Sequence, residues 1–211
     1  MEHAKQVEQT KIKIKKAFIQ LIHEKGMTAL TVSDITRIAE INRGTFYTHY
    51  VDKYDLLSSI ENHLYHNIQQ AMHEELTAYS SWSHDEIQNI LSSPYNVFIQ
   101  ALGYIDSERE TFQAILSDNG DQNFINQIKT LIDLEMTEGL HKRHGDYSDI
   151  MPLDYTKEII LSSLINTVTH WLRKPNPESP QIVADILLKS RFLSPQQLLV
   201  FPESNQRNNR D

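Results

Sequence analysis

Cysteine is absent from the 211-residue sequence, and its absence excludes several kinds of chemistry together. A chain without cysteine has no disulfide framework, no thiolate ligand for a metal ion and no cysteine nucleophile. Such a fold must be held by its hydrophobic core, and a reducing compartment is its simplest setting. We therefore expect a cytoplasmic protein.

Glycine and proline are scarce, with 6 and 7 residues in the whole chain. A meander of short strands needs regular turns, which are built mainly from these two residue types. The glycines form neither of the G-x-x-x-x-G-K-[ST] and G-x-G-x-x-G patterns that cradle phosphate, and the G-x-S-x-G and H-E-x-x-H patterns of hydrolases are missing too. The composition therefore favours helices and a protein that is not an enzyme and needs no cofactor.

Long hydrophobic runs are also missing. No eighteen apolar residues follow one another, and residues 1–11 are polar and charged. A membrane-spanning helix needs about 20 apolar residues, and a secretion signal needs an apolar stretch behind a basic start. We therefore expect neither export nor a membrane partner.

Positive charge is in deficit, since 20 Lys and Arg oppose 28 Asp and Glu for a net charge of −8. Residues 1–56 nevertheless hold nine basic and seven acidic residues, whereas residues 57–211 hold eleven and twenty-one. A phosphate-binding surface is therefore expected only in residues 1–56. The densest basic group there, which is either a phosphate-facing collar or a solvated helix face, is Lys11, Lys13, Lys15 and Lys16.

Helical periodicity is what the sequence does contain, beginning with a segment from about Gln9 to Lys25. Apolar residues recur there every three or four positions, and Gly26 follows where a left-handed helix cap is common. Thr31 then predicts the N-cap of a second, short helix, with Asp34 three residues on completing a capping box.

A third short helix is predicted from Arg43 to Tyr50, with Asn42 as its N-cap. Phe46 and Tyr50 lie four residues apart and therefore on one side of this helix. Only a few residues separate it from the preceding helix, which is the spacing of a helix-turn-helix.

A long helix is predicted to follow, capped by Asp52 and ending near Tyr79, with an apolar stripe along one side. Further helical patterns occupy residues 84–105, 107–117, 121–143, 154–173 and 179–191. We expect residues 1–56 to form the helix-turn-helix domain, residues 57–203 a larger helical domain for dimerisation and possible effector binding, and residues 204–211 a flexible tail.

The segment from Thr31 to Leu57, TVSDITRIAEINRGTFYTHYVDKYDLL, resembles the helix-turn-helix of the TetR family of transcriptional regulators. The matching features, in chain order, are Asp34-Ile35, Arg43-Gly44-Thr45-Phe46-Tyr47-Thr48-His49-Tyr50, Lys53 and Leu56-Leu57. Glu40 departs from the pattern, because the family usually has glycine at this point of the turn, where a positive φ is easier without a side chain. The resemblance implies an all-α fold, with an N-terminal three-helix helix-turn-helix domain followed by a larger helical C-terminal domain.

The same resemblance implies a function. Proteins of this family bind double-stranded operators as homodimers, most act as repressors, and many release DNA when the C-terminal domain binds a small-molecule effector. We therefore predict a DNA-binding repressor, although the sequence assigns no effector-binding residue. The alternative is a coactivator or adaptor that keeps the fold and acts through a protein partner, and the intact third helix argues against it.

The predicted DNA-binding face lies on the third helix. At 100° per residue, Gly44, Thr45 and Thr48 lie opposite Phe46 and Tyr50, and small polar groups suit a helix that enters the major groove.

Arg43 starts this helix and is long enough to reach O6 and N7 of guanine. The resemblance adds Tyr47, His49 and Lys53 as contacts to the DNA backbone, and Thr31 as a further hydroxyl contact. Each has a structural alternative: Tyr47 could belong to the core, His49 to the solvated surface, and Lys53 to an ordinary helix start.

The dimer interface is predicted on the last two helical segments, as the family resemblance implies, and the alternative is an intramolecular core. The residues proposed for it are Leu161, Leu164, Ile165, Val168, Trp171, Ile182 and Ile186.

Two weaker patterns concern small ligands. Five aromatic residues either line an effector cavity or belong to plain core, which is the commoner case: Tyr65, Phe98, Tyr104, Phe112 and Phe124. Three histidines at helical spacing, His63, His66 and His73, raise the possibility of zinc sensing. We favour a solvated helix face for them and predict no metal site.

Overall fold

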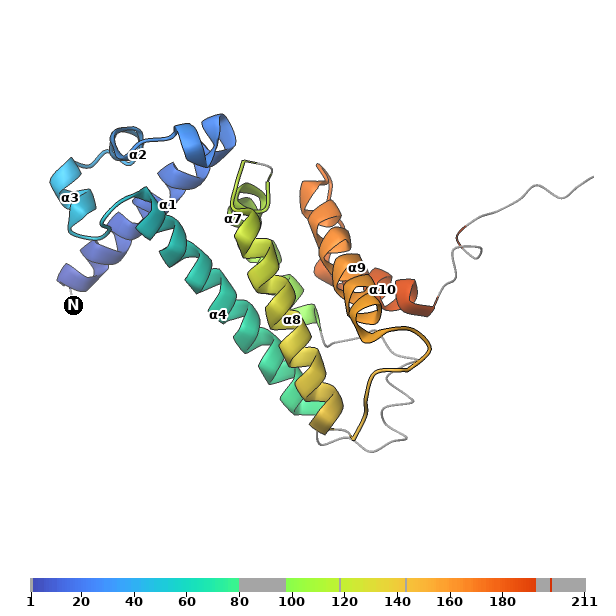
Figure 1. Cartoon of the computed structure of the whole chain (residues 1–211). Helices are drawn as coiled ribbons and strands as arrows, with labels where there is room; N and C mark the ends of the chain where they lie inside the picture. The colour runs from blue at the N-terminus through green and yellow to red at the C-terminus, as the bar shows by residue number, and fades with distance from the viewer. Residues whose placement is uncertain (1, 80–97, 118, 143, 193–197, 199–211) are drawn as a thin grey trace, which may run out of the picture.

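The structure is a computed structural model, and it describes residues 2–79, 98–117, 119–142, 144–192 and 198. All regular elements in these residues are helices, arranged as a small N-terminal domain that one long helix joins to a larger helical body (Figure 1). The prediction of an all-α fold that begins with a helix-turn-helix domain is confirmed.

Helix α1 (Glu2–Ala29) is broken at Gly26, where φ is 77° and ψ is 163°. This backbone conformation is essentially restricted to glycine. The positive φ agrees with the expected role of glycine, but the extended ψ differs from that of the predicted left-handed cap. The helix begins at Glu2 rather than near Gln9. Its predicted inner face is buried: Ile14, Ala17, Phe18, Leu21 and Ile22.

Helices α2 (Val32–Ile38) and α3 (Arg43–Tyr47) form the helix-turn-helix, and both have their predicted caps. The Thr31 hydroxyl accepts a bond from the Asp34 N–H, and the Asp34 carboxylate accepts one from the Thr31 N–H. The Asn42 side chain accepts a bond from the N–H three residues on, at 2.7 Å. Each such cap stabilises a helix start by about 1 kcal/mol, which matters for helices as short as these.

Helix α4 (Lys53–Tyr79) joins the two domains (Figure 1). Asp52 begins it as predicted, because its Oδ1 accepts bonds from the N–H groups of Tyr54 and Asp55 at 2.8 and 2.9 Å. The predicted boundary after residue 56 therefore lies inside a continuous helix. The apolar stripe of α4 is buried over both domains: Leu57, Ile60, Leu64, Ile68 and Met72.

The larger body consists of α6 (Ile99–Ser107), α7 (Arg109–Ile115), α8 (Gln122–Lys142), α9 (Leu153–Arg173) and α10 (Pro180–Phe192). Helix α4 packs against α6 and α8, and α9 packs against α7, α8 and α10. The last four predicted segments match α7 to α10 within a few residues. The segment predicted at 84–105 is confirmed over α6, whereas residues 80–97 and the predicted tail at 204–211 lie outside the described residues.

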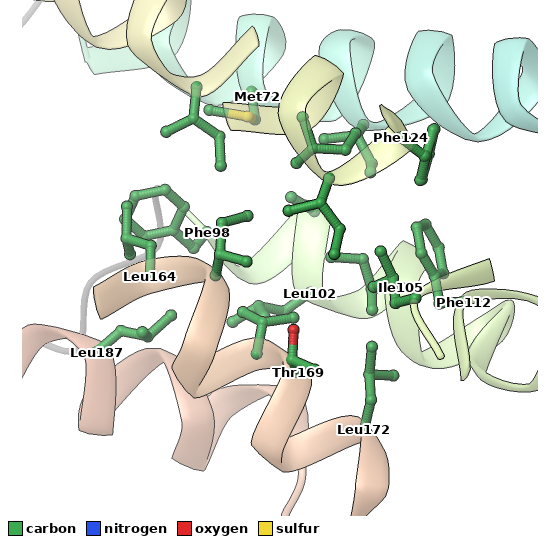
Figure 2. Close-up of a pocket in the computed structure, with 18 residues that line it drawn as sticks. Met72, Phe98, Leu102, Ile105, Phe112, Phe124, Leu164, Thr169, Leu172 and Leu187 are labelled. Atoms are coloured by element: carbon green, nitrogen blue, oxygen red, sulfur yellow. The ribbon is translucent and has the colours of Figure 1, made fainter. Parts of the chain in front are cut away.

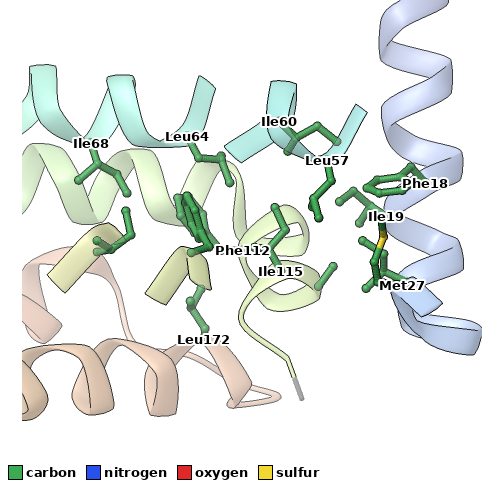
Figure 3. Packing of buried hydrophobic residues seen from close by; sticks show 14 of the residues in the cluster. Phe18, Ile19, Met27, Leu57, Ile60, Leu64, Ile68, Phe112, Ile115 and Leu172 are labelled. Carbon is green, nitrogen blue, oxygen red and sulfur yellow. The ribbon is translucent and has the colours of Figure 1, made fainter. Parts of the chain in front are cut away.

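One hydrophobic core runs through both domains. Figure 3 shows its middle part, where Ile19 and Met27 of α1 lie beside Leu57 of α4 and Ile115 at the end of α7. Because packed side chains leave little free space, α7 and the DNA-binding domain cannot shift relative to each other without repacking this contact.

The residues predicted for a dimer interface need correction. Leu161, Leu164 and Trp171 are buried inside the subunit, and Trp171 Nε1 donates a bond of 2.8 Å to the carbonyl of Glu178. Ile165 and Val168 line an internal cavity of the same subunit. The stripe on α9 therefore serves the subunit's own core, because an amphipathic pattern shows which face is buried but not what covers it.

Ile182 and Ile186 of α10 differ from the rest of that set. They lie one turn apart with 51% and 41% of their surface exposed. They are the two most exposed members of the predicted interface.

Candidate nucleic-acid interface

Helix α3 ends at Tyr47, with Thr48 as its C-cap, and not at the predicted Tyr50. Residues 43–50 nevertheless separate inward and outward side chains as predicted. Phe46 and Tyr50 are buried, with Phe46 fully inaccessible, whereas the outer side exposes four residues of the predicted set: Arg43, Gly44, Tyr47 and Thr48. Thr45 and His49 are half-buried at its margins. The outer side therefore combines small, polar and cationic groups and no aliphatic side chain.

The cap of α3 explains why glycine occupies position 44. Asn42 Oδ1 accepts bonds from the N–H and the hydroxyl of Thr45 at 2.7 and 3.0 Å. A Cβ atom on Gly44 would lie 3.2 Å from this oxygen and would crowd the cap. Glycine therefore leaves room for the Asn42 cap, and its lack of a side chain lets another molecule approach the helix backbone closely at this point.

Arg43 connects the two helices of the motif. Its guanidinium donates a hydrogen bond to the Ser33 hydroxyl on α2, and both side chains are exposed. A guanidinium has five N–H donors, so this bond leaves the group able to meet a further acceptor. The contact holds Arg43 over the outer face of the helix-turn-helix.

Tyr47 is 56% exposed, and its ring meets that of Phe46 edge to face with centroids 5.6 Å apart. This contact anchors the base of the ring to the core. The phenol is therefore a surface group, and the core alternative for Tyr47 does not hold.

Thr31 has a structural role that occupies its hydroxyl. The hydroxyl donates to Asp34 Oδ2 at 2.7 Å and also accepts the Asp34 N–H. Lys25 lies 3.1 Å from the same carboxylate. The bonds from Thr31 and from Lys25 lower the Asp34 pKa to about 2, so this carboxylate stays ionised and holds the start of α2.

Lys53 is used differently from the prediction. Its ammonium donates bonds of 3.0, 3.0 and 2.9 Å to the backbone carbonyls of Met27, Thr28 and Leu30. An ammonium has three N–H donors, so these carbonyls take all of them. The structure therefore gives Lys53 an internal partner in place of the predicted phosphate.

The turn between α2 and α3 has the predicted strain. Glu40 adopts a φ of 54°, in the left-handed region that costs a residue with a side chain about 1–2 kcal/mol. The family's usual glycine would relieve this cost. Glu40 is exposed and therefore also adds negative charge beside the motif.

Three of the four lysines in the basic group on α1 are compatible with either alternative, and the fourth fits neither. Lys11, Lys13 and Lys16 are exposed, as a solvated or phosphate-facing face requires. Lys15 instead pairs with Glu108 of the larger body at 2.7 Å.

The larger body contains an apolar cavity of about 70 Å³ between α4, α6, α7, α8, α9 and α10 (Figure 2). Phe98, Phe112 and Phe124 line it, so these three of the five aromatic residues follow the cavity alternative and not the plain core that the sequence favours. The other two do not line it: Tyr104 packs edge to face against Phe112, and Tyr65 borders a shallow surface pocket. Among the described residues that line the cavity, Thr169 has the one polar side chain and no side chain is charged.

The three histidines of α4 do not converge. His66 Nδ1 lies 2.7 Å from the carbonyl oxygen of Asn62, and His73 Nδ1 lies 3.9 Å from Glu135 Oε2. In the described part of the chain, no three His, Cys, Asp or Glu residues are grouped so that they could hold a metal ion. None of the described helices is long and apolar enough to cross a membrane.

Comparison with known proteins supports this arrangement. Residues 14–60 match the family of bacterial regulatory proteins of the tetR type, and residues 92–191 match a transcriptional regulator C-terminal region. The uncharacterised HTH-type transcriptional regulator YxbF of Bacillus subtilis (strain 168) is 40% identical over 57 residues. That match covers 26% of this chain and only 15% of the relative's length.

Solved structures share the fold. A TetR transcriptional regulator from Streptococcus agalactiae 2603V has a TM-score of 0.58 at 23% identity, covering 90% of this chain and 97% of that one. NalD, the secondary repressor of the MexAB-OprM multidrug efflux pump in Pseudomonas aeruginosa, has a TM-score of 0.58 at 20% identity, covering 88% and 96%. With a matching family profile at each end and a helix-turn-helix of the expected geometry, the chain belongs to the TetR family of transcriptional regulators.

Proposed function

We propose that this protein is a homodimeric repressor that reads its operator with α3 and leaves it when an uncharged, apolar effector binds the larger body. The observation that carries the proposal is the outer face of α3, which exposes Arg43, Gly44 and Thr48 while Phe46 is buried beneath them. A helix with this surface can approach base edges in the major groove, because no aliphatic side chain holds it away.

Each residue of this face has a proposed role. Arg43 reads guanine through O6 and N7, and Thr48 adds a hydroxyl at the groove floor. Tyr47 and His49 contact phosphates at the two sides of the helix, and these contacts set its register without carrying sequence information. Thr45 contributes through the cap of α3 and through its half-buried hydroxyl.

The homodimer follows from the size of the motif. One short helix reads few base pairs, so specific binding needs two copies over paired half-sites about 10 base pairs apart or a multiple of that distance. We place Ile182 and Ile186 in the contact between copies because they expose adjacent apolar surface on α10. Replacing both with lysine would shift the protein from dimer to monomer in sedimentation velocity, whereas Gln181→Lys, at an exposed position on another side of the same helix, would not.

The chemistry of the cavity defines the effector. A carboxylate or ammonium group would lose its hydration there without meeting an opposite charge, which is strongly unfavourable. The ligand is therefore a neutral, largely hydrocarbon molecule, and Thr169 offers its hydroxyl to one polar atom. When this ligand binds the cavity, the protein releases its operator and repression ends.

Selection of DNA by the purified protein tests the proposal. Genomic fragments are captured at low ionic strength, sequenced and then footprinted. We expect enriched fragments to share a two-fold symmetric sequence, and a reporter driven by such a promoter to be expressed more strongly without the protein. Capture without any shared sequence would reject the proposal.

A further inference from the structure

The backbone turn at residues 26–30, between the break in α1 and the start of α2, is bonded to both domains. We call it the α1–α2 turn. Lys53 holds it from the start of α4, and Asn119 holds it from the loop whose described residues are 117 and 119–121, which we call the α7–α8 loop. The turn leads directly into Thr31, the N-cap of the helix-turn-helix.

The bonds from Lys53 close the helix-turn-helix at its base. Its ammonium meets the carbonyls of Met27, Thr28 and Leu30 at 2.9–3.0 Å, 23 to 26 residues back along the chain. The residue just after the motif is thereby tied to the residues just before it. The orientation of α3 relative to α1 and α4 depends on this connection.

The other side of the α1–α2 turn is bonded to the larger body. The Met27 N–H donates a bond of 3.1 Å to the Asn119 carbonyl. Gly26 lies so close to the same residue that a Cβ atom at position 26 would stand 3.3 Å from Asn119 Cβ. The Met27 side chain is buried in the core that both domains share (Figure 3).

The α7–α8 loop in turn adjoins the cavity. Leu116 immediately precedes it, Phe124 follows it closely, and both side chains line the cavity. The loop is wound tightly, since Asp121 N–H donates to the Ile115 carbonyl at 3.1 Å and a Cβ atom on Gly120 would collide with that oxygen at 2.0 Å. The described residues of this loop are thereby bonded to the end of α7.

We propose that the α1–α2 turn is the relay between the cavity and the DNA-binding helix, and that Lys53 is its positioning residue rather than a phosphate contact. A molecule that displaces Leu116 and Phe124 shifts the α7–α8 loop, which moves the turn through Met27 and Asn119. The turn then shifts α3 through Lys53. This relay rests on the proposed function, because it describes how that function is regulated.

The first test separates a positioning role for Lys53 from a phosphate contact. Loss of one phosphate contact from each subunit of the dimer would lower the slope of log affinity against log salt by about 1.8, at about 0.9 for each contact. We expect Lys53→Met to keep the wild-type slope, to weaken operator binding about tenfold, and to speed hydrogen exchange of the amides in residues 26–30 about tenfold. Lys53→Arg, which keeps donors for the carbonyls, should recover most of the protection.

The role assigned to Lys53 is overturned by a slope lowered by about 1.8, or by unchanged hydrogen exchange of the amides in the α1–α2 turn. Hydrogen exchange is measured on the free protein, so it tests the bonds from Lys53 to the α1–α2 turn independently of DNA binding. A wild-type protein that binds no duplex would reject the proposed function and leave the exchange result standing.

The second test imitates an occupied cavity by substitution. Leu116→Phe adds bulk beside the α7–α8 loop, and Leu187→Phe adds the same ring from α10 (Figure 2). We expect Leu116→Phe to speed exchange of the Met27 amide about tenfold and to weaken operator binding, because overpacking displaces backbone. Leu187→Phe is the control for overpacking itself and should leave that amide at its wild-type rate. Equal effects of the two substitutions on the Met27 amide, or none from Leu116→Phe, would overturn the relay.

Discussion

Lys15 of α1 and Glu108, which lies between α6 and α7, form an ion pair of 2.7 Å that joins the DNA-binding domain to the larger body. The two residues are 93 positions apart in the chain. Glu108 also accepts a bond of 2.8 Å from the Thr111 hydroxyl. The pair gives the junction a polar contact beside the packed one made by Ile19 and Ile115.

The pair makes the junction sensitive to acid. Burial raises the pKa of Glu108, but the bonds from Lys15 and Thr111 outweigh it and leave the pKa below its ordinary value of 4.5. Because the unfolded chain binds the proton more readily, the stabilisation is present above pH 4.5 and is lost as the pH falls through the lower, folded-state pKa. We expect Glu108→Gln to cost about 1 kcal/mol of unfolding free energy in urea at pH 7 and much less near pH 3. Glu110→Gln on the exposed side of α7 is the control, and an equal loss from it would contradict this role for the pair.

Gly26 should tolerate no side chain. Its φ of 77° and ψ of 163° are strained for any other residue, so Gly26→Ala should lower the unfolding free energy by about 1–3 kcal/mol. At Gly103, inside α6, a Cβ atom would meet no other atom within 4 Å, and Gly103→Ala should stabilise the helix by about 0.5–1 kcal/mol. Thermal unfolding of the two variants compares them directly, and similar shifts in Tm would argue against the backbone explanation.

Glu40 should be improved by the residue that the family usually has. Glu40→Gly removes the cost of a positive φ and should raise the unfolding free energy by about 1 kcal/mol. Glu40→Ala removes the same charge but keeps the strain, so it should bring no such gain. If both variants gained equally in chemical denaturation, the cause would be charge and not backbone strain.

Glu61 on α4 is 6% exposed, and its Oε1 has no hydrogen-bond partner among the residues that the structure describes. Burial and the neighbouring Asp121 raise its pKa from 4.5 to about 7. The folded protein therefore holds the proton more tightly than the unfolded chain, so stability falls as the pH rises from 4.5 through 7.

Glu61→Gln should abolish that dependence and stabilise the protein at pH 8 by roughly 2–3 kcal/mol, with little effect at pH 4.5. Asp121→Asn should also weaken the dependence of stability on pH, because it removes the neighbouring charge that raises the Glu61 pKa. Urea unfolding at a series of pH values measures both, and a wild-type curve that is flat between pH 5 and 8 would contradict the assignment.

Local signals in the sequence were sufficient for the N-caps of α2, α3 and α4, but not for every helix boundary, since α1 begins at Glu2 and α3 ends at Tyr47. Thr31, Asn42 and Asp52 bond to N–H groups two or three residues away, so residue type and spacing alone identify them. The same holds for Gly26, whose position after an apolar run marks a helix end. The buried side of α3 followed from the spacing of Phe46 and Tyr50.

Partners distant in the chain could not be predicted in the same way. A lysine at a helix start has the same sequence pattern whether it binds a DNA phosphate or a carbonyl of its own chain. Lys53 donates to carbonyls that precede it by more than 20 residues. The stripe on α9 indicated that Leu161 and Leu164 are buried, but a partner subunit and the subunit's own α8 and α10 would select the same residues. The partner of Lys53 and the element that covers the α9 stripe both depend on how the whole chain packs.

Base discrimination by Arg43 is the most direct test of the account. Operator affinity is measured by fluorescence anisotropy for the wild type and for Arg43→Lys, each on the operator and on a duplex with the contacted guanine replaced by adenine. The wild type should lose about tenfold or more on the altered duplex, whereas the variant, which keeps the charge but replaces the planar guanidinium with a single ammonium, should discriminate clearly less between the two duplexes. Equal discrimination by the two proteins would contradict the claim that α3 reads the operator through Arg43.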